Sequence, residues 1–202
     1  MPAARESLLD AARSALARRP WSAVRMVDVA AAAGVSRQTL YNEFGSKDGL
    51  ARALVRRAAD GWLAGVEHAL AGPGDPGRRL TAAAEWTASA ARGDPLVKAV
   101  LTGCWSERLP SPAPSAVPSC GGVPAQRAAD GTLPSPAALL ATVRERAVAA
   151  VCAPGATQAD RAELADVCEL VFRLALSCVA APPRERGMAG LMDGLLHRGR
   201  PG

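Results

Sequence analysis

Side chains that could read DNA bases gather in one short stretch of the sequence. Residues 36 to 42 are Ser-Arg-Gln-Thr-Leu-Tyr-Asn. Arginine suits guanine, and glutamine or asparagine suits adenine, each through paired hydrogen bonds, whereas hydroxyl groups suit phosphate contacts that position without specifying. We therefore expect Arg37 and Gln38 to contact base edges. The expected DNA contacts of this stretch are Ser36, Arg37, Gln38, Thr39, Tyr41 and Asn42.

The surrounding residues predict two short helices joined by a tight turn. Residues 27 to 33 have apolar or small side chains on every face, which suits a helix held between neighbours rather than one on a surface. Gly34 can take the left-handed conformation of a sharp turn, and Ser36 is a favourable N-cap for the second helix. If Leu40 and Phe44 face the core, the polar residues remain outside, as insertion into a major groove requires.

Residues 33 to 50, Ala-Gly-Val-Ser-Arg-Gln-Thr-Leu-Tyr-Asn-Glu-Phe-Gly-Ser-Lys-Asp-Gly-Leu, resemble the DNA-binding domain of the tetracycline-repressor (TetR) family of bacterial regulators. The resemblance extends over about residues 8 to 55. It implies a homodimer, a palindromic double-stranded operator, and a C-terminal half that binds a small effector and releases the DNA. It also implies that Tyr41 and Lys47 contact the DNA backbone.

One position departs from the family pattern. The family usually has a threonine that caps the first helix of the pair and touches a phosphate, and Arg25 stands there in this sequence. The cap is lost, but a cation gains reach to the DNA backbone, so we include Arg25 among the expected DNA contacts. Ser22 is an alternative cap, which would start the helix earlier.

Charge and motif content favour DNA binding over catalysis. Residues 1 to 60 contain 10 Arg or Lys against 6 Asp or Glu, a net charge of +4 out of +5 for the whole chain. Such a local basic excess is the electrostatic signature of a phosphate-binding surface. The two histidines, His68 and His197, are not in a motif with a nucleophile or metal partner, and no glycine-rich phosphate loop or paired-carboxylate motif occurs. We therefore expect neither enzymatic activity nor a cofactor or metal.

Two further absences in the sequence bear on location. The chain has no apolar run of 18 uncharged residues, which a membrane span would require. Its N-terminus has charged residues and no apolar signal core. We therefore expect a cytoplasmic protein without a membrane partner.

Apolar residues recur at helical spacing along most of the chain, which predicts an all-α fold. The expected helices cover residues 3–18, 27–33, 36–44, 46–70, 78–92, 95–105, 137–152, 158–180 and 186–197. We expect a three-helix helix-turn-helix DNA-binding domain in residues 1–50 and a helical effector-binding and dimerisation domain in residues 51–202. Residues 106–136 hold seven of the sixteen prolines and no aromatic residue, which predicts a flexible loop.

The last two helices are apolar and joined tightly, which fits the antiparallel helix pair that dimerises the TetR family. The resemblance therefore implies that they form the dimer interface; burial within their own subunit is the alternative. Trp62, Trp86 and Trp105 are candidate walls of an effector pocket, because aromatic rings supply large rigid contact area. Ordinary core packing is the alternative for each. The scarcity of charge in these helices favours an apolar or amphipathic effector.

All five cysteines lie in the second half, and none has the spacing of a metal or redox motif. The favoured interpretation is small buried side chains in a reducing cytoplasm. The alternatives are DNA binding gated by thiol oxidation, or DNA binding without any effector.

Overall fold

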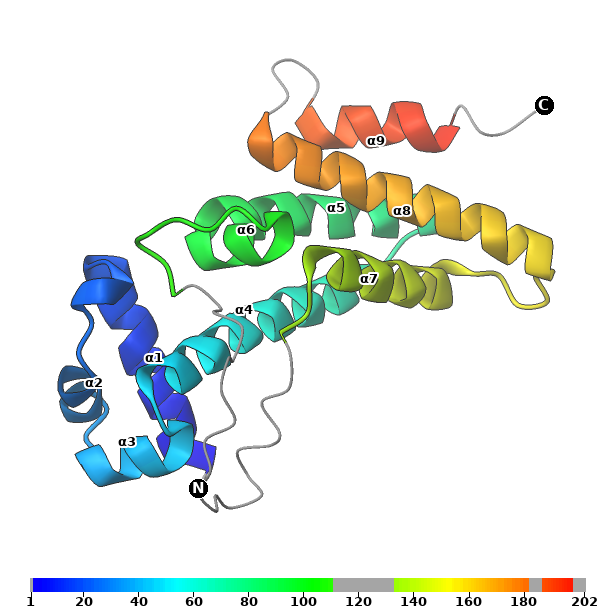
Figure 1. Ribbon diagram of the computed structural model, residues 1–202. Coiled ribbons are helices and arrows are strands. Elements are labelled where there is room, and N and C mark those ends of the chain that lie inside the picture. The colour runs from blue at the N-terminus through cyan, green and yellow to red at the C-terminus, as the bar shows by residue number, and fades with distance from the viewer. Residues whose placement is uncertain (1, 111–132, 182–186, 198–202) are drawn as a thin grey trace. The chain divides into compact units, whose positions relative to one another are not determined.

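The computed structural model describes residues 2–110, 133–181 and 187–197, and every regular element in these ranges is a helix (Figure 1). The expected all-α fold class is confirmed. The elements up to residue 70 are α1 (Pro2–Arg18), the 3-10 helix η1 (Trp21–Ala23), α2 (Met26–Ala32), α3 (Arg37–Phe44) and α4 (Lys47–Leu70). The remaining helices are α5 (Pro76–Gly93), α6 (Pro95–Thr102), α7 (Pro136–Val151), α8 (Gln158–Ala180) and α9 (Gly187–His197).

The chain divides into two compact units, and the division falls inside α4. Unit 1 consists of Met1–Ala58 and Cys104–Leu133, and unit 2 of Ala59–Gly103 and Pro134–Gly202. The segment that follows α6 therefore belongs with the N-terminal helices. Of the loop expected over residues 106–136, residues 111–132 lie outside the described part of the chain, and α7 begins at Pro136.

In unit 1 the three N-terminal α-helices pack on one another around fully buried leucines such as Leu8 and Leu40. The predicted turn and cap are confirmed: Gly34 has a φ of +68°, and the Thr39 backbone N–H donates to Ser36 Oγ at 3.0 Å. The N-terminal half of α4 is linked to α1 by ion pairs of Arg57. Its guanidinium pairs with Glu6 at 3.3 Å and with Asp10 at 2.8 Å.

Two expectations about α2 are wrong. Its side chains are not buried on every face, because Val27 is 50% exposed and only Met26, Val29 and Ala30 are buried. A seven-residue helix with α1 and α3 as its neighbours in unit 1 keeps one face open to solvent. The earlier start that a Ser22 cap would give is not found either. The helix begins after Arg25, whose side chain makes no capping hydrogen bond.

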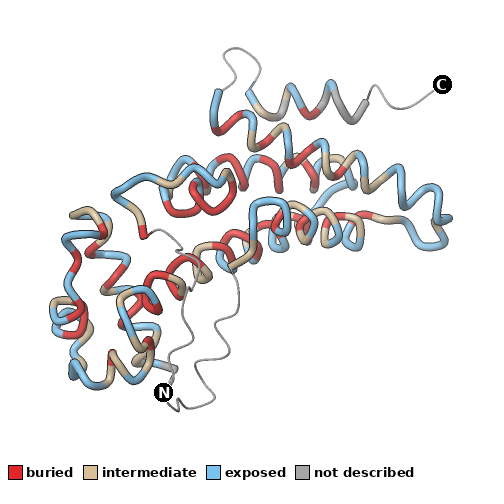
Figure 2. The backbone as a smooth tube through the Cα atoms, in the orientation of Figure 1, coloured by how far each residue is buried: buried red, intermediate tan, exposed pale blue. Residues whose placement is uncertain are grey.

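In unit 2, α5 is the central helix and packs against α6, α7, α8 and α9. Figure 2 shows the buried residues along α5 and α8 in red. Most of these helices begin at a side-chain cap, since Asp75, Asp94, Ser135 and Thr157 each accept a hydrogen bond from a backbone N–H of the first turn. The helix α6 ends at Thr102 rather than near residue 105, because Gly103 takes the left-handed conformation with a φ of +72°.

Candidate nucleic-acid interface

The helix α3 presents a polar face to solvent and an apolar face to the core. Leu40 and Phe44 are 0% and 5% exposed, which anchors the helix on unit 1. The six polar residues expected to contact DNA lie on the outside or at its edge. Ser36, Arg37, Gln38 and Asn42 are exposed, and Thr39 and Tyr41 are half-buried.

The exposed side chains of α3 form two pairs, each between residues four positions apart. The guanidinium carbon of Arg37 lies 5.3 Å from the centroid of the Tyr41 ring. Gln38 Nε2 donates to Asn42 Oδ1 at 2.8 Å. Arg37, Gln38 and Tyr41 line an open hollow on this face. The polar groups of α3 are thus ordered by neighbours on the same helix.

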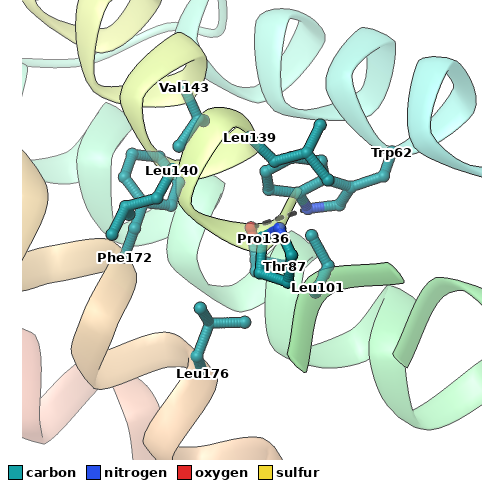
Figure 3. Close-up of a pocket in the computed structure, with 9 residues that line it drawn as sticks. All are labelled: Trp62, Thr87, Leu101, Pro136, Leu139, Leu140, Val143, Phe172 and Leu176. Carbon is teal, nitrogen blue, oxygen red and sulfur yellow. Dashed lines mark hydrogen bonds between the residues drawn. The ribbon is translucent and has the colours of Figure 1, made fainter. Parts of the chain in front are cut away.

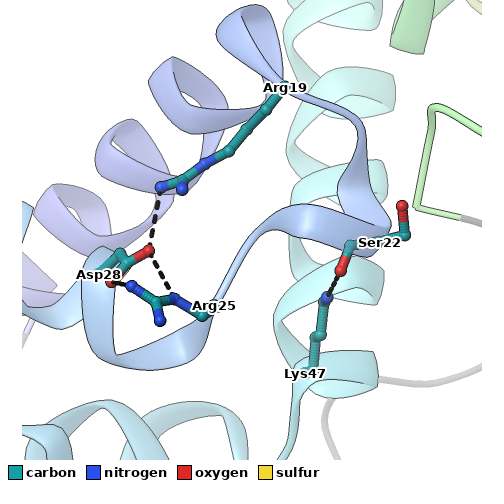
Figure 4. Close-up of polar contacts among 5 residues, drawn as sticks. All are labelled: Arg19, Ser22, Arg25, Asp28 and Lys47. Carbon is teal, nitrogen blue, oxygen red and sulfur yellow. Dashed lines mark hydrogen bonds and ion pairs between the residues drawn. The ribbon is translucent and has the colours of Figure 1, made fainter.

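Arg25 lies beside the start of α2 in an ionic cluster that also contains Arg19 and Asp28 (Figure 4). Its guanidinium bonds to both carboxylate oxygens of Asp28, at 3.1 and 3.0 Å, and Arg19 Nη2 lies 3.2 Å from one of them. The hydrogen bonds from Arg25 hold the pKa of the Asp28 carboxyl below its usual range. The Arg25 side chain remains 73% exposed while Asp28 is 25% exposed. The cluster therefore presents cations outward.

Sequence reasoning missed Arg19 and Asp28. The three-residue spacing of Arg25 and Asp28 is a recognisable signal for an ion pair at the start of a helix. Arg19 carries no such signal, because it lies just after α1 and reaches Asp28 only in the folded unit.

Lys47 connects the start of α4 to η1. Its Nζ donates to the backbone carbonyl of Ser22 at 3.1 Å (Figure 4). The same Nζ lies 5.4 Å from the centroid of the Trp21 ring. The Trp21 backbone N–H in turn donates to the carbonyl of Arg108 at 2.9 Å. Both Lys47 and the segment after α6 therefore form hydrogen bonds with η1.

Unit 2 contains a small apolar cavity (Figure 3). Its lining residues are Trp62, Thr87, Leu101, Pro136, Leu139, Leu140, Val143, Phe172 and Leu176. The only polar groups drawn into it are bonded to protein: Trp62 Nε1 donates to Thr87 Oγ1 at 3.2 Å, and that hydroxyl donates to the Ala83 carbonyl at 2.9 Å. The cavity volume is about 10 Å³, about the size of one water probe. In this conformation the space has room for about one water molecule.

The three tryptophans expected to line an effector pocket are placed differently. Trp62 is 3% exposed and lines the cavity. Trp86 is 40% exposed, and its Nε1 donates to the Trp62 carbonyl at 3.1 Å. Trp105 is half-buried and belongs to unit 1. The structure therefore joins Trp62 to Trp86 but does not bring all three tryptophans around one cavity.

The thiols differ in exposure. Cys104 is exposed and Cys152 is half-buried, whereas Cys168 and Cys178 are buried. Burial raises the pKa of the Cys168 thiol to about 11. Cys120 lies outside the described residues.

The described residues contain neither a cluster of metal ligands nor a helix suited to span a membrane. Within them, no group of three or more His, Cys, Asp or Glu side chains could hold a metal ion. Among the helices that the structure describes, none combines the length and apolar character that crossing a membrane requires.

Unit 1 contains a helix-turn-helix, the motif that places a helix in the major groove of DNA. It consists of the short helix α2, a turn at the left-handed Gly34, and the capped helix α3 with its polar outer face. The family profile described as "Bacterial regulatory proteins, tetR family" matches residues 8–54. Residues 8–54 therefore resemble the DNA-binding domain of TetR-family regulators, and the two relatives described next are transcriptional regulators.

Two curated relatives are similar over their matched regions. The chain is 44% identical over 100 residues to the HTH-type transcriptional regulator AlkX of Mycobacterium tuberculosis, which covers 49% of this chain and 47% of that protein. It is 40% identical over 81 residues to the HTH-type transcriptional activator FasR of Mycolicibacterium smegmatis. That match covers 40% of this chain and 37% of FasR. These matches span about half, or less, of the length of either relative.

A solved structure supports the likeness in fold. The chain resembles a tetR-family transcriptional regulator from Streptomyces coelicolor with a TM-score of 0.57, over 98% of this chain and 79% of that one. The two sequences are 19% identical, so the likeness concerns the fold alone.

Proposed function

We propose that the protein is a homodimeric repressor that binds a palindromic DNA operator through α3 and leaves it when a small apolar molecule enters unit 2. The observation that carries this proposal is the division of α3 into a buried apolar face and an exposed polar face. A helix of this kind fits a major groove, where base edges present distinct donor and acceptor patterns. We place the DNA contacts within residues 1–50, and effector binding and dimerisation within residues 51–202.

Within this proposal, the contacts divide into reading and positioning. Arg37, Gln38 and Asn42 read base edges, because their exposed groups form paired hydrogen bonds with guanine or adenine. The phosphate contacts come from hydroxyl and cationic groups beside them: Ser36, Thr39, Tyr41, Arg25 and Lys47. The exposure of Arg25 supports its part, since a phosphate can approach its guanidinium while Asp28 holds the other edge.

Dimerisation is assigned to α8 and α9. Leu170 on α8 is 49% exposed and Leu191 on α9 is 37% exposed, and the two helices pack on each other. Exposed leucines on two helices that pack together favour burial against a second copy, and in a two-fold dimer both copies bury the same residues. Such a dimer can place two copies of α3 about 34–36 Å apart, one turn of DNA.

The effector site is assigned to the cavity of Figure 3. Its lining is almost entirely apolar, and its single hydroxyl already has partners, so an uncharged apolar molecule fits the chemistry. Because the cavity holds only about 10 Å³, binding must separate its walls. Trp62 in this wall and Lys47 belong to the same helix, α4, which gives a route by which binding changes the DNA contacts. A regulator of this kind acts in the cytoplasm.

The test is selection from a random double-stranded DNA library with the purified full chain at near-physiological salt. The expected product is a palindrome whose half-sites lie about one helical turn apart or at a related spacing. Recovery of salt-sensitive DNA without a common sequence would contradict specific operator binding. Recovery of a single half-site would contradict the homodimer while leaving base reading by α3 in place.

A further inference from the structure

We propose that Tyr41 determines base specificity by acting through Arg37: its ring holds the Arg37 guanidinium in an orientation that reads guanine. This role is separate from the phosphate contact assigned to the Tyr41 hydroxyl. It rests on the proposed binding of an operator through α3.

The Tyr41 side chain has less conformational freedom than the Arg37 side chain beside it. The guanidinium carbon of Arg37 lies 5.3 Å from the Tyr41 ring centroid, within the range of a cation–π contact. Tyr41 is half-buried, whereas Arg37 is exposed. Across the ranges that the structure describes, Arg37 forms no hydrogen bond and no ion pair with protein. The anchored ring therefore restrains a side chain that would otherwise sample many rotamers.

Stacking on the Tyr41 ring leaves the N–H donors of Arg37 available to bind a base. In the parallel arrangement that a guanidinium adopts when it stacks on an aromatic ring, the ring lies against the face of the guanidinium and the N–H donors point outward in its plane. Two of these donors are what the O6 and N7 acceptors of guanine require. Arg37 can therefore stay stacked on Tyr41 while it reads a base, and part of the ordering that binding demands is already present in the free protein.

The neighbouring pair shows the contrast. Gln38 and Asn42 bond to each other through their amide groups at 2.8 Å. That hydrogen bond uses one donor of Gln38 and the carbonyl oxygen of Asn42, which are groups that would pair with an adenine. Reading by this pair requires the bond to be exchanged or shared, whereas reading by Arg37 requires no such exchange. The inference therefore concerns guanine and not adenine.

The test compares two operator duplexes that differ in one atom. In one duplex, a single guanine is replaced by 7-deazaguanine, which lacks the N7 acceptor. The relevant guanine is the one whose replacement weakens DNA binding by the wild-type protein but not by Arg37→Ala. The measured quantity is the dissociation constant for the 7-deazaguanine duplex divided by that for the guanine duplex. Both constants are measured with one protein preparation, so an inactive fraction cancels from the ratio.

Tyr41→Phe and Tyr41→Leu form the matched variants, because the first keeps the ring and loses the hydroxyl, and the second loses both. We expect Tyr41→Phe to bind both duplexes more weakly by the same factor and to keep the wild-type ratio. We expect Tyr41→Leu to reduce the ratio about 3- to 10-fold, as the loss of a pre-ordered side chain implies. In an Arg37→Ala background, Tyr41→Leu should leave the ratio unchanged.

Other results would overturn the inference. An unchanged ratio in Tyr41→Leu would show that the ring does not act through Arg37, and equal ratios in Tyr41→Phe and Tyr41→Leu would assign the effect to the hydroxyl. If no guanine depends on Arg37 while the wild type still selects a sequence, this inference fails and operator binding stands. If the wild type selects no sequence, operator binding itself fails.

Discussion

The indole ring of Trp86 lies where a side chain on Gly65 would have to be. A Cβ atom built on Gly65 would approach Trp86 Cε2 to 2.1 Å, which is far closer than carbon atoms allow. From this position Trp86 Nε1 donates to the Trp62 carbonyl at 3.1 Å. Gly65 therefore permits the close approach of the Trp86 ring to α4. Around Gly61, a Cβ would meet nothing within 4 Å.

Gly65→Ala and Gly61→Ala are consequently expected to change stability in opposite directions. The first forces the Trp86 ring away from α4 and should lower the free energy of unfolding by about 1–3 kcal/mol. The second replaces glycine with a better helix former in open space and should raise stability by up to about 1 kcal/mol. Thermal or denaturant unfolding of the full chain measures both. Equal changes in the two variants would show that Trp86 is not held against Gly65 in solution.

Arg37→Ala and Gln38→Ala should each weaken operator binding by about 1–3 kcal/mol and relax the choice of base at one position. The reason is the loss of paired hydrogen bonds to a base edge. Arg92→Ala, which removes an exposed arginine from α5, is the matched control and should preserve base choice. Competition binding with single-base operator variants provides the measurement. Unchanged affinity and base preference in both α3 variants would remove these residues from the readout.

Lys47→Ala should weaken binding to all DNA sequences alike and reduce the slope of log affinity against log salt by about 1. The chain has one other lysine, Lys98, which is exposed on α6 and serves as the control for loss of the same charge. Titrations at several salt concentrations distinguish the two variants. A loss confined to one base position would contradict a phosphate contact. Equal losses in the two variants would indicate a general charge effect.

Thr87→Val should destabilise the protein by about 1–3 kcal/mol, because the buried Trp62 indole N–H then lacks an acceptor. Thr87→Ser keeps the hydroxyl and loses only a methyl group, so it separates the hydrogen bond from packing. Unfolding free energies of the two variants give the comparison. If Thr87→Val were the more stable of the two, the Trp62–Thr87 bond would not be a stabilising feature of the cavity wall.

Alkylation should distinguish the thiols by exposure. At neutral pH, iodoacetamide should modify Cys104 in the folded protein and leave Cys168 unmodified until the chain unfolds. Burial disfavours the thiolate and raises the pKa of Cys168 to about 11, so the reactive form stays scarce up to mildly alkaline pH. Mass spectrometry of peptides locates the modified sites. Rapid modification of Cys168 under native conditions would contradict its burial in the folded protein.

The sequence was most informative where structure is decided by neighbours along the chain. The turn at Gly34 and the cap at Ser36 follow from local backbone preferences, and the burial of Leu40 and Phe44 follows from helical spacing. The exposure of Val27 was not predictable in this way, because composition does not tell how many neighbours a helix has.

Contacts between elements distant in sequence were also beyond prediction. Arg19 reaches Asp28, and Lys47 reaches the Ser22 carbonyl, only after unit 1 has folded. The cavity wall shows the same limit. Trp62 lines it and Trp86 lies partly in solvent, although both were equally plausible as pocket residues from the pattern of apolar side chains.

The bond from the Trp21 amide to the Arg108 carbonyl has a consequence for engineering. A regulator with a new input could be made by joining the DNA-binding part of this protein to the effector-binding part of another at a single junction. A junction after Ala58 would here leave Trp21 without its acceptor and would discard buried Pro110. A DNA-binding part transferred from this protein therefore needs two junctions, so that it includes residues 104–110 as well as the N-terminal helices.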